Sequence, residues 1–448
     1  MRLAGTTVRS AAAAGVVALL LAAGPATPPS GGALPLAALA PGAPQVNAAL
    51  VAAAITGPLS DASLGAGAVG EVMDARTGQL LWAAAPHQAL LPASAAKLLT
   101  AAAALTTLRA TARPVTALVT AAPVSAGTLG GDLVLRGGGD VLLTAQPSGA
   151  WPARASLDQL AAGLVASGVR RVSGALVADG SRWQGPRVAP GWRPDYLTQG
   201  SVAPVTALGV DEGGEPLTSR GDRSGDPALE AVHALRAALT RHGVTVTGPD
   251  VAGTAPSAAR TLVAVSGPTV AVAVAEMLQN SDNDMAESLA RQVAAARGLP
   301  ASFAGASQAV TAAVEALHVP VDGLNLVDGS GLSRDDRIAP ATLGGLLHLA
   351  AAPSALGGRP ELRPLVAALA TAGFDGTLAP RYRGDPQKAA AGVVRAKTGA
   401  LLGVSALAGS VVDAQGRELL FVLVSNAVTN RSSAESALDR AAAALASL

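Results

Sequence analysis

The chain has 448 residues, half of them hydrophobic, with 2% aromatic and 14% charged residues and a net charge of +1. This length suggests about two domains with a largely aliphatic core, and the near-zero charge gives no argument for binding nucleic acid or an anionic membrane surface. Cysteine is absent, which excludes disulfides, thiolate metal sites, a cysteine nucleophile and a lipoprotein anchor.

The N-terminus has the pattern of a secretory signal peptide. Arg2 and Arg9 precede a short apolar run, SAAAAGVVALLLAAG, and small residues with prolines follow it. We expect residues 1–26 to be a signal peptide and 27–45 a linker, with cleavage near Ala40 and a buried helix of the fold as alternatives. The mature protein is then extracytoplasmic, and it contacts a membrane only if the N-terminal segment is retained as an anchor.

The patterns along the chain predict sheet elements near both ends and helices between them. The expected elements are a helix at 46–55, a hairpin at 68–84, a helix from Ser94, helices near 156–168 and 227–242 among short strands, a long helical stretch after 266, helices near 304–317 and 340–352, three C-terminal strands and a helix at 431–447.

This order predicts an α/β (α+β) fold with one antiparallel sheet that is built from both ends of the chain and covered by helices. Residues 46–108 and 258–448 would form this discontinuous domain. Residues 109–257, where short valine-rich strands alternate with glycine and proline turns, would form an inserted smaller α+β domain.

Ser94 and Lys97 lie at the start of the alanine-rich helix. The chain has only three lysines, Lys97, Lys388 and Lys397, among 32 basic residues. A serine needs a base to become a good nucleophile, and lysine can be that base once burial or a nearby cation lowers its pKa from about 10.4. Arginine cannot, because its pKa stays above about 12. The alternative is a solvated surface lysine.

Two further short stretches can carry chemistry. Ser281-Asp282-Asn283 interrupts an apolar helical pattern, so it is either an ordinary turn between helices or a polar group presented at a cleft. There the Ser281 hydroxyl could relay a proton, while the Asn283 amide could hold a substrate carbonyl and orient a lysine.

Lys397-Thr398-Gly399 ends an apolar strand pattern. Lys397 and Thr398 could bind a carboxylate through charge and a hydrogen bond, and Gly399 would let another backbone come close. The backbone N–H of Ala400 could complete an oxyanion hole with that of Ser94. In isolation, the tripeptide could equally be a lysine at a strand end followed by a turn.

The ordered set S-x-x-K, S-D-N and K-T-G resembles the signature of penicillin-recognising serine acyltransferases and β-lactamases. The longer stretches PASAAKLLTAAAAL, GDLVLRGGGD, PGWRPDYLTQGSVAPVTAL, NSDNDMAESLAR, LVDGSGLSRDDR and AKTGALLGVSALAG together resemble class C low-molecular-mass penicillin-binding proteins. These are D-alanyl-D-alanine carboxypeptidases and endopeptidases with a transpeptidase-like fold. The resemblance runs from about residue 45 to the C-terminus.

The resemblance implies a penicillin-sensitive serine peptidase that acts on peptidoglycan stem peptides ending in D-Ala-D-Ala. Ser94 would be the acylated nucleophile and Lys97 its base, while Ser281 would transfer protons and Asn283 would bind the substrate amide. No cofactor or metal is implied, and β-lactams would be covalent inhibitors.

The substrate's terminal carboxylate would be held by Lys397 and Thr398, with Gly399 and Ala400 beside it. Asp140, in the GGGD stretch, would bind the free amino end of a diaminopimelate side chain. The family usually has Thr or Ser where this chain has Ala400, so one hydroxyl near the carboxylate is lost. The interval from Lys97 to Ser281 is also short for two inserted domains, so we expect one or a trimmed second.

Two alternative functions remain at this point. A serine β-lactamase shares the three motifs, but the class A glutamate motif E-x-x-L-N has no match. A non-catalytic wall-binding member of the fold would not need the intact catalytic set. Zinc catalysis has no support, because there is no H-E-x-x-H and the histidines are scattered at positions 87, 233, 242, 318 and 348.

Overall fold

The computed structural model of the chain describes residues 39–40, 42–147, 152–213 and 223–448. These residues belong to one compact unit, Ala37–Leu448. The expected signal peptide and most of the expected linker lie outside the described residues. No helix in the described ranges has the length and apolar character that a membrane crossing needs.

A six-stranded antiparallel sheet is built from both ends of the chain, as predicted. Its order is β12-β13-β14-β15-β1-β2, so an N-terminal hairpin pairs with C-terminal strands through β1 and β15. The strands are β1 (Ala68–Asp74), β2 (Leu80–Ala84), β12 (Ala370–Thr371), β13 (Val394–Leu401), β14 (Val404–Val412) and β15 (Glu418–Asn426).

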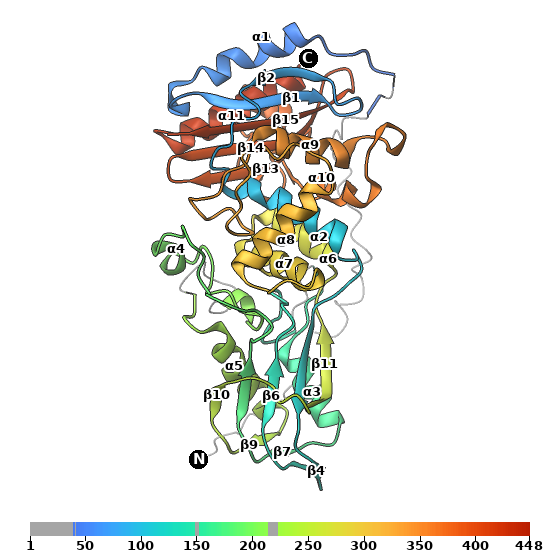
Figure 1. Cartoon of the computed structure of the whole chain (residues 1–448), viewed down its shortest axis with the longest axis vertical. Helices are drawn as coiled ribbons and strands as arrows, with labels where there is room; N and C mark the ends of the chain where they lie inside the picture. Colours follow the sequence, from blue (N-terminus) through green and yellow to red (C-terminus); the bar gives the residue numbers. More distant parts are fainter. Residues whose placement is uncertain (1–38, 41, 148–151, 214–222) are drawn as a thin grey trace, which may run out of the picture. The chain divides into compact units, whose positions relative to one another are not determined.

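Helices cover both faces of this sheet (Figure 1). Along β15, Leu419 and Phe421 pack with α1 and α11, whereas Leu420 and Val422 pack with the other helices, including α2 and α9. Since successive side chains of a strand point to opposite faces, a strand buried on both faces must be apolar throughout. The helices are α1 (Ala48–Leu59) and α11 (Arg431–Ala446) on one face, and α2 (Lys97–Thr107), α6 (Val270–Asn280), α7 (Asn283–Ala296), α8 (Phe303–Glu315), α9 (Pro340–Ala351) and α10 (Arg363–Ala367) on the other.

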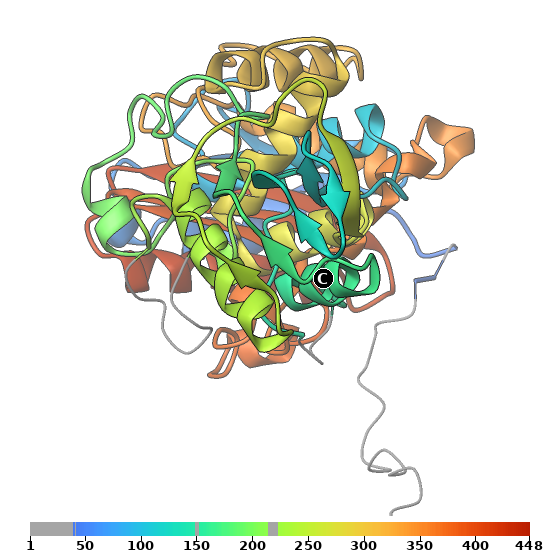
Figure 2. The same cartoon turned by 90° about the horizontal axis from the view of Figure 1, so that it is seen from below.

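The middle of the chain forms a separate mixed sheet with the order β10-β8-β6-β3-β11. Helices α3 and α5 pack against each other and share an aliphatic core with this sheet (Figure 2). A small sheet, β4-β5-β7-β9, lies in the same part of the chain. The elements are β3 (Val115–Thr120), β4 (Val124–Ser125), β5 (Thr128–Leu129), β6 (Leu133–Arg136), α3 (Leu157–Ala166), β7 (Arg171–Val172), β8 (Leu176–Asp179), α4 (Asp195–Thr198), α5 (Pro227–Arg241), β9 (Thr245–Val246), β10 (Asp250–Ala252) and β11 (Arg260–Ser266).

The two large sheets therefore use different parts of the chain, although the described residues form one compact unit. Strand β11 pairs with β3 as far as Ser266, so the sheet of the middle segment extends past the boundary expected at 257. The division into an inserted and a discontinuous domain stays a prediction.

Candidate active site

Ser94 lies in a short 3-10 turn, η2 (Ala93–Ala96), and α2 begins at Lys97. The prediction that the α-helix starts at Ser94 was therefore wrong by one turn. Ala93, directly before the serine, has a φ of +49°, a left-handed conformation that an α-helix does not tolerate. Such strain at a non-glycine residue is common at functional sites, and here it immediately precedes the serine.

Lys97 is fully buried and its Nζ has three hydrogen-bond acceptors. It donates to Ser94 Oγ at 3.0 Å, to Asn283 Oδ1 at 2.6 Å and to the backbone oxygen of Ser330 at 2.7 Å. Three segments that are far apart in the sequence thus converge on one amine. A lysine ammonium has three protons to donate, so its hydrogen-bonding capacity is used completely.

The direction of each bond follows from the chemistry of the partners. The Ser330 carbonyl can only accept, and the Asn283 amide is oriented because its Nδ2 donates to the Ser201 carbonyl at 2.8 Å. Asn283 Oδ1, also an acceptor only, must then face Lys97. When Lys97 loses one proton, its two remaining protons stay on these acceptors and its lone pair faces the Ser94 hydroxyl.

Burial lowers the pKa of Lys97 to about 8, against the opposing effect of the negative charges of Asp328, Glu287, Asp282 and Asp284. Burial also holds the pKa of Lys397 well below its usual range, and the nearby charge of Lys97 lowers it further. The two lysines therefore lie close enough for the charge of one to act on the other. Desolvation is nevertheless the main cause of the lowered pKa of Lys97, because it disfavours the charged form.

The polar break at Ser281–Asn283 separates α6 from α7. Ser281 has a left-handed φ of +59° at the end of α6, and the Asp282 side chain caps α7 by accepting from Met285 N at 2.8 Å. This geometry directs Asn283 to Lys97. Ser281 lines a cavity beside Asn283, but no hydrogen bond joins its hydroxyl to the described atoms of Ser94 or Lys97.

The K-T-G stretch lies on β13 beside the turn that carries Ser94. A Cβ at Gly399 would be 2.7 Å from Pro92 O and 3.2 Å from Ala95 N, so only glycine allows this close approach, as the sequence predicted. Lys397 is fully buried and donates to the Thr398 carbonyl at 2.8 Å, while Thr398 Oγ1 donates to Thr377 Oγ1 at 2.9 Å.

An open cleft contains Ser94, Asn283 and Ala400 among its lining residues. The middle segment supplies part of the wall through Tyr196, Gln199 and Ser201, and β13 with its following turn supplies Leu401 and Leu402. A second hollow on the other side of Asn283 and Ser201 is lined by Ser281 and Thr377. The site therefore lies where the middle segment meets the helices and the edge of the six-stranded sheet.

Asp140 is not among the residues that line either part of this cleft. It is 5% exposed, its Oδ1 accepts from Leu142 N at 3.1 Å, and its Oδ2 has no hydrogen-bond partner in the described structure. Burial raises its pKa to about 6. The carboxyl lies against Gly267, in a small cavity that Asp284 and Ser288 also line. The expected contact of Asp140 with substrate has no support in this geometry and stays a prediction.

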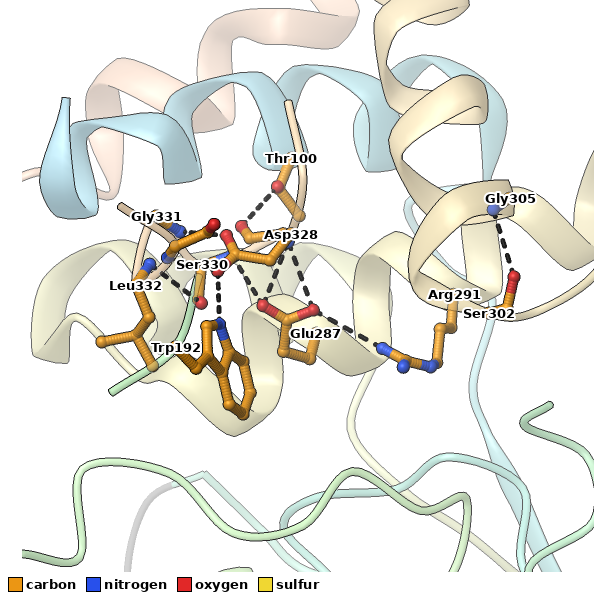
Figure 3. A network of polar contacts seen from close by, with 12 residues as sticks. Thr100, Trp192, Glu287, Arg291, Ser302, Gly305, Asp328, Ser330, Gly331 and Leu332 are labelled. Atoms are coloured by element: carbon orange, nitrogen blue, oxygen red, sulfur yellow. Dashed lines mark hydrogen bonds and ion pairs between the residues drawn. The ribbon is translucent and has the colours of Figure 1, made fainter. Parts of the chain in front are cut away.

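The loop at 328–333 belongs to the site, although no motif in the sequence indicates a chemical role for it. The composition of its stretch DGSGLSRDD predicts only a turn near the cleft, yet the Ser330 carbonyl binds Lys97 directly. Glu287 and Asp328 hold this loop through its backbone N–H groups (Figure 3). The glycine- and serine-rich composition indicated the turn, but nothing in it indicated the contact with Lys97.

The fold and this site define a serine acyltransferase of the penicillin-binding type. The structure of penicillin binding protein 4 (dacB) from Haemophilus influenzae superposes with a TM-score of 0.72 and covers 88% of this chain and 98% of that chain. Its identity is 22%, so this likeness establishes the fold alone, and it confirms the expected penicillin-binding-protein fold.

The chain belongs to the D-Ala-D-Ala carboxypeptidase 3 (S13) family, whose model matches residues 51–228 and 215–447. Carboxypeptidase DacB of Mycolicibacterium smegmatis is 38% identical over an alignment of 384 positions, and the match covers 84% of this chain and 80% of that protein. D-alanyl-D-alanine carboxypeptidase of Actinomadura sp. (strain R39) is 31% identical over an alignment of 371 positions, and the match covers 66% of this chain and 65% of that protein. The predicted family and the predicted class of enzyme, a serine-type D-Ala-D-Ala carboxypeptidase, are confirmed.

Proposed function

We propose that this enzyme cleaves the D-Ala-D-Ala end of peptidoglycan stem peptides through an acyl-enzyme on Ser94, with Lys97 as the general base. Ser94 Oγ attacks the carbonyl carbon of the penultimate D-Ala while Lys97 takes the hydroxyl proton. The C–N bond then breaks, D-Ala leaves with a proton, and water hydrolyses the resulting ester.

One observation carries this proposal, namely the set of partners around Lys97 Nζ. Asn283 Oδ1 and Ser330 O accept two of its protons at 2.6 and 2.7 Å, so the lone pair of the neutral amine faces Ser94 Oγ at 3.0 Å. A pKa of about 8 for Lys97 leaves a useful neutral fraction near neutral pH, as a general base requires.

The β13 strand supplies the groups for the other parts of the substrate. Among the described residues, Lys97 is the only charged group that shifts the pKa of Lys397, so this buried amine has no anionic partner. A substrate carboxylate beside Thr398 would supply one. The backbone N–H groups of Ser94 and Ala400 would bind the oxyanion, supported by the close approach of β13 and η2 at Gly399.

Asn283 and Ser281 complete the proposed assignment. Asn283 lines both parts of the cleft, so it can contact the substrate amide as well as orient Lys97. Ser281 would return a proton to the leaving amine, which requires its hydroxyl to turn toward the cleft.

The same cleft would accept a cross-linked peptide or a β-lactam. The hollow continues on both sides of Asn283, which leaves room for a second peptide, so endopeptidase activity is proposed beside carboxypeptidase activity. A β-lactam would acylate Ser94 as the peptide does. The wall lies outside the cytoplasm, and the positively charged and apolar N-terminal pattern supports export of this enzyme.

The test combines purified wall peptides with a fluorescent penicillin. The wild-type protein should release D-Ala or split a cross-link, and it should form a long-lived labelled adduct. Ser94→Ala should abolish both, while Ser447→Ala, an exposed serine near the C-terminus, should change neither.

Persistent labelling of the Ser94→Ala variant would remove the nucleophile assignment. Rapid hydrolysis of the penicillin by the wild-type protein, without release of D-Ala from peptides, would instead favour a β-lactamase. Absence of all covalent labelling in the wild-type protein would favour a non-catalytic wall-binding role.

A further inference from the structure

Glu287 is a fully buried acid that lies one helical turn after Asn283 on α7. Residues four apart on a helix share one face, so α7 presents Asn283 to Lys97 and Glu287 to the region behind it. A buried carboxylate without partners would be costly, and the contacts of Glu287 show what this acid holds.

The Glu287 carboxylate accepts hydrogen bonds from two successive backbone N–H groups of the 328–333 loop. Gly329 N donates to Oε1 at 3.0 Å and to Oε2 at 3.2 Å, and Ser330 N donates to Oε1 at 2.9 Å. The carbonyl of the same Ser330 accepts from Lys97 Nζ at 2.7 Å. Glu287 therefore contacts Ser330 directly (Figure 3), and Ser330 in turn contacts the lysine.

Other contacts hold the loop but do not replace this one. Asp328 accepts from the N–H groups of Ser330 and Gly331 within the loop and from Trp192 Nε1 at 2.6 Å. Thr100, on the same helix as Lys97, donates to the Gly329 carbonyl at 2.7 Å. Gly329 also packs closely against Ala286 and Ala290 of α7, but among the described residues Glu287 is the side chain of this helix that hydrogen-bonds to the loop.

We infer that Glu287 is a positioning residue for the proposed base, because it holds the Ser330 carbonyl where this oxygen keeps one proton of Lys97 directed away from Ser94. This inference rests on the proposed roles of Ser94 and Lys97. Without the carbonyl in place, the lone pair of neutral Lys97 would no longer be confined to the direction of the serine.

The charges around the pair give the inference a measurable consequence. Four acids raise the pKa of Lys97 through their charge, and in order of decreasing effect they are Asp328, Glu287, Asp282 and Asp284. Lys397 also lies close to Lys97. Glu287 faces Asp328 and Arg291, and Asp336 lies within reach of both acids. Burial raises the pKa of Glu287 to about 7, while the hydrogen bonds that its carboxylate accepts from Gly329 N and Ser330 N favour the ionised form. Its negative charge stabilises protonated Lys97.

The experiment measures the rate constant of acylation by a fluorescent penicillin from about pH 6 to pH 10. In Glu287→Gln the charge is lost, so the pKa of Lys97 falls and the acid limb of the profile should move to lower pH by at least about half a unit. The plateau should also fall about tenfold, because the amide nitrogen of a glutamine would replace Oε2, which accepts from Gly329 N at 3.2 Å, by a donor that faces this N–H group.

Two further variants separate positioning from a general loss of stability. Glu287→Asp keeps the charge but shortens the reach, so it should slow acylation about tenfold with the acid limb in place. Glu71→Gln replaces another buried glutamate whose pKa is also raised to about 7 and which has no contact with the 328–333 loop, so it should leave the profile unchanged.

An unmoved acid limb in Glu287→Gln would overturn the inference, as would an unchanged acylation rate in Glu287→Asp. If Glu287→Gln does not fold, the Asp variant alone decides. These results differ from a failure of the proposed function, in which the penicillin would still label Ser94→Ala.

Discussion

Two buried regions of this enzyme each contain an ionisable side chain, and the two side chains differ in their hydrogen-bond partners. At the Lys97 corner, where η2, α7 and the 328–333 loop meet, every proton of the buried amine has an acceptor. In the core between β1 and α9, Glu71 is 5% exposed and its Oε1 has no hydrogen-bond partner among the described residues. It lies against Gly344, where a side chain would collide with the carboxyl.

Burial disfavours the charged form in both regions. It lowers the pKa of Lys97 to about 8 and raises that of Glu71 to about 7. At Lys97, carboxylates and three acceptors limit the shift and give the amine a direction. At Glu71, the charge of His87 opposes the effect of burial and is smaller than it. The comparison shows that burial makes a group titrate near neutral pH, while its partners decide whether it can do chemistry.

The largest expected effect is at the Lys97 corner. Lys97→Arg keeps a positive charge but cannot become neutral, so acylation and D-Ala release should fall about 10²- to 10⁴-fold. In the wild-type protein, acylation should rise with pH as Lys97 loses its proton and level off above about pH 8. Near-normal acylation by the arginine variant, measured with a fluorescent penicillin, would contradict the role of a neutral amine.

A second test disturbs the same corner without changing a charge. A Cβ in Gly399→Ala would meet Pro92 O at 2.7 Å, so β13 should move away from the turn that carries Ser94. We expect acylation to fall about 10²-fold, because moving β13 away from Ser94 misplaces the groups that bind the substrate relative to the nucleophile. The matched change Gly384→Ala is the control, because nothing lies within 4 Å of its Cβ position and Gly384 is not among the residues that line the cleft. Equal losses in both variants would show that the effect is not specific to the approach of β13.

The Glu71 region should respond in stability and not in activity. The pKa of Glu71 is about 7 in the folded protein and about 4.3 in the unfolded chain. At pH values between these two, Glu71 binds a proton in the folded protein that it has lost in the unfolded chain. The protein's free energy of unfolding therefore falls as pH rises through this window, by up to about 3 kcal/mol. Denaturant unfolding at pH 5 and pH 8 should show this fall in the wild-type protein and in the exposed control Glu230→Gln, but a smaller one in Glu71→Gln. An equal fall in all three proteins would mean that Glu71 is ionised when buried.

The smallest effect is expected at Ala400, which lines the cleft beside Ser94. Ala400→Ser restores the hydroxyl that the family usually has at this position, and one added hydrogen bond to the substrate carboxylate is worth a few-fold to about tenfold in kcat/KM. The gain should appear with peptides that end in a free carboxylate. An equal gain with a peptide amide would place the effect elsewhere.

The sequence predicted much of the fold, because strand and helix patterns are local. The hairpin at β1 and β2, the three C-terminal strands and the terminal helix were all expected near their observed bounds. The helix start at Ser94 was wrong, since the left-handed conformation of Ala93 depends on neighbouring segments: its carbonyl lies against Gly331, where even a Cβ could not fit.

By itself, the sequence determined which groups this enzyme brings to its chemistry: a serine, two rare lysines and an asparagine in short stretches whose residue types limit what they can do. The tertiary structure alone decided how these groups are oriented and supported. Ser330 binds Lys97, Glu287 holds Ser330, and Asp140 lines a small cavity that does not include Ser94 or Asn283. These contacts join residues that are distant along the chain, and they depend on how α2, α7 and the 328–333 loop pack together, for which the local pattern of the sequence contains no signal.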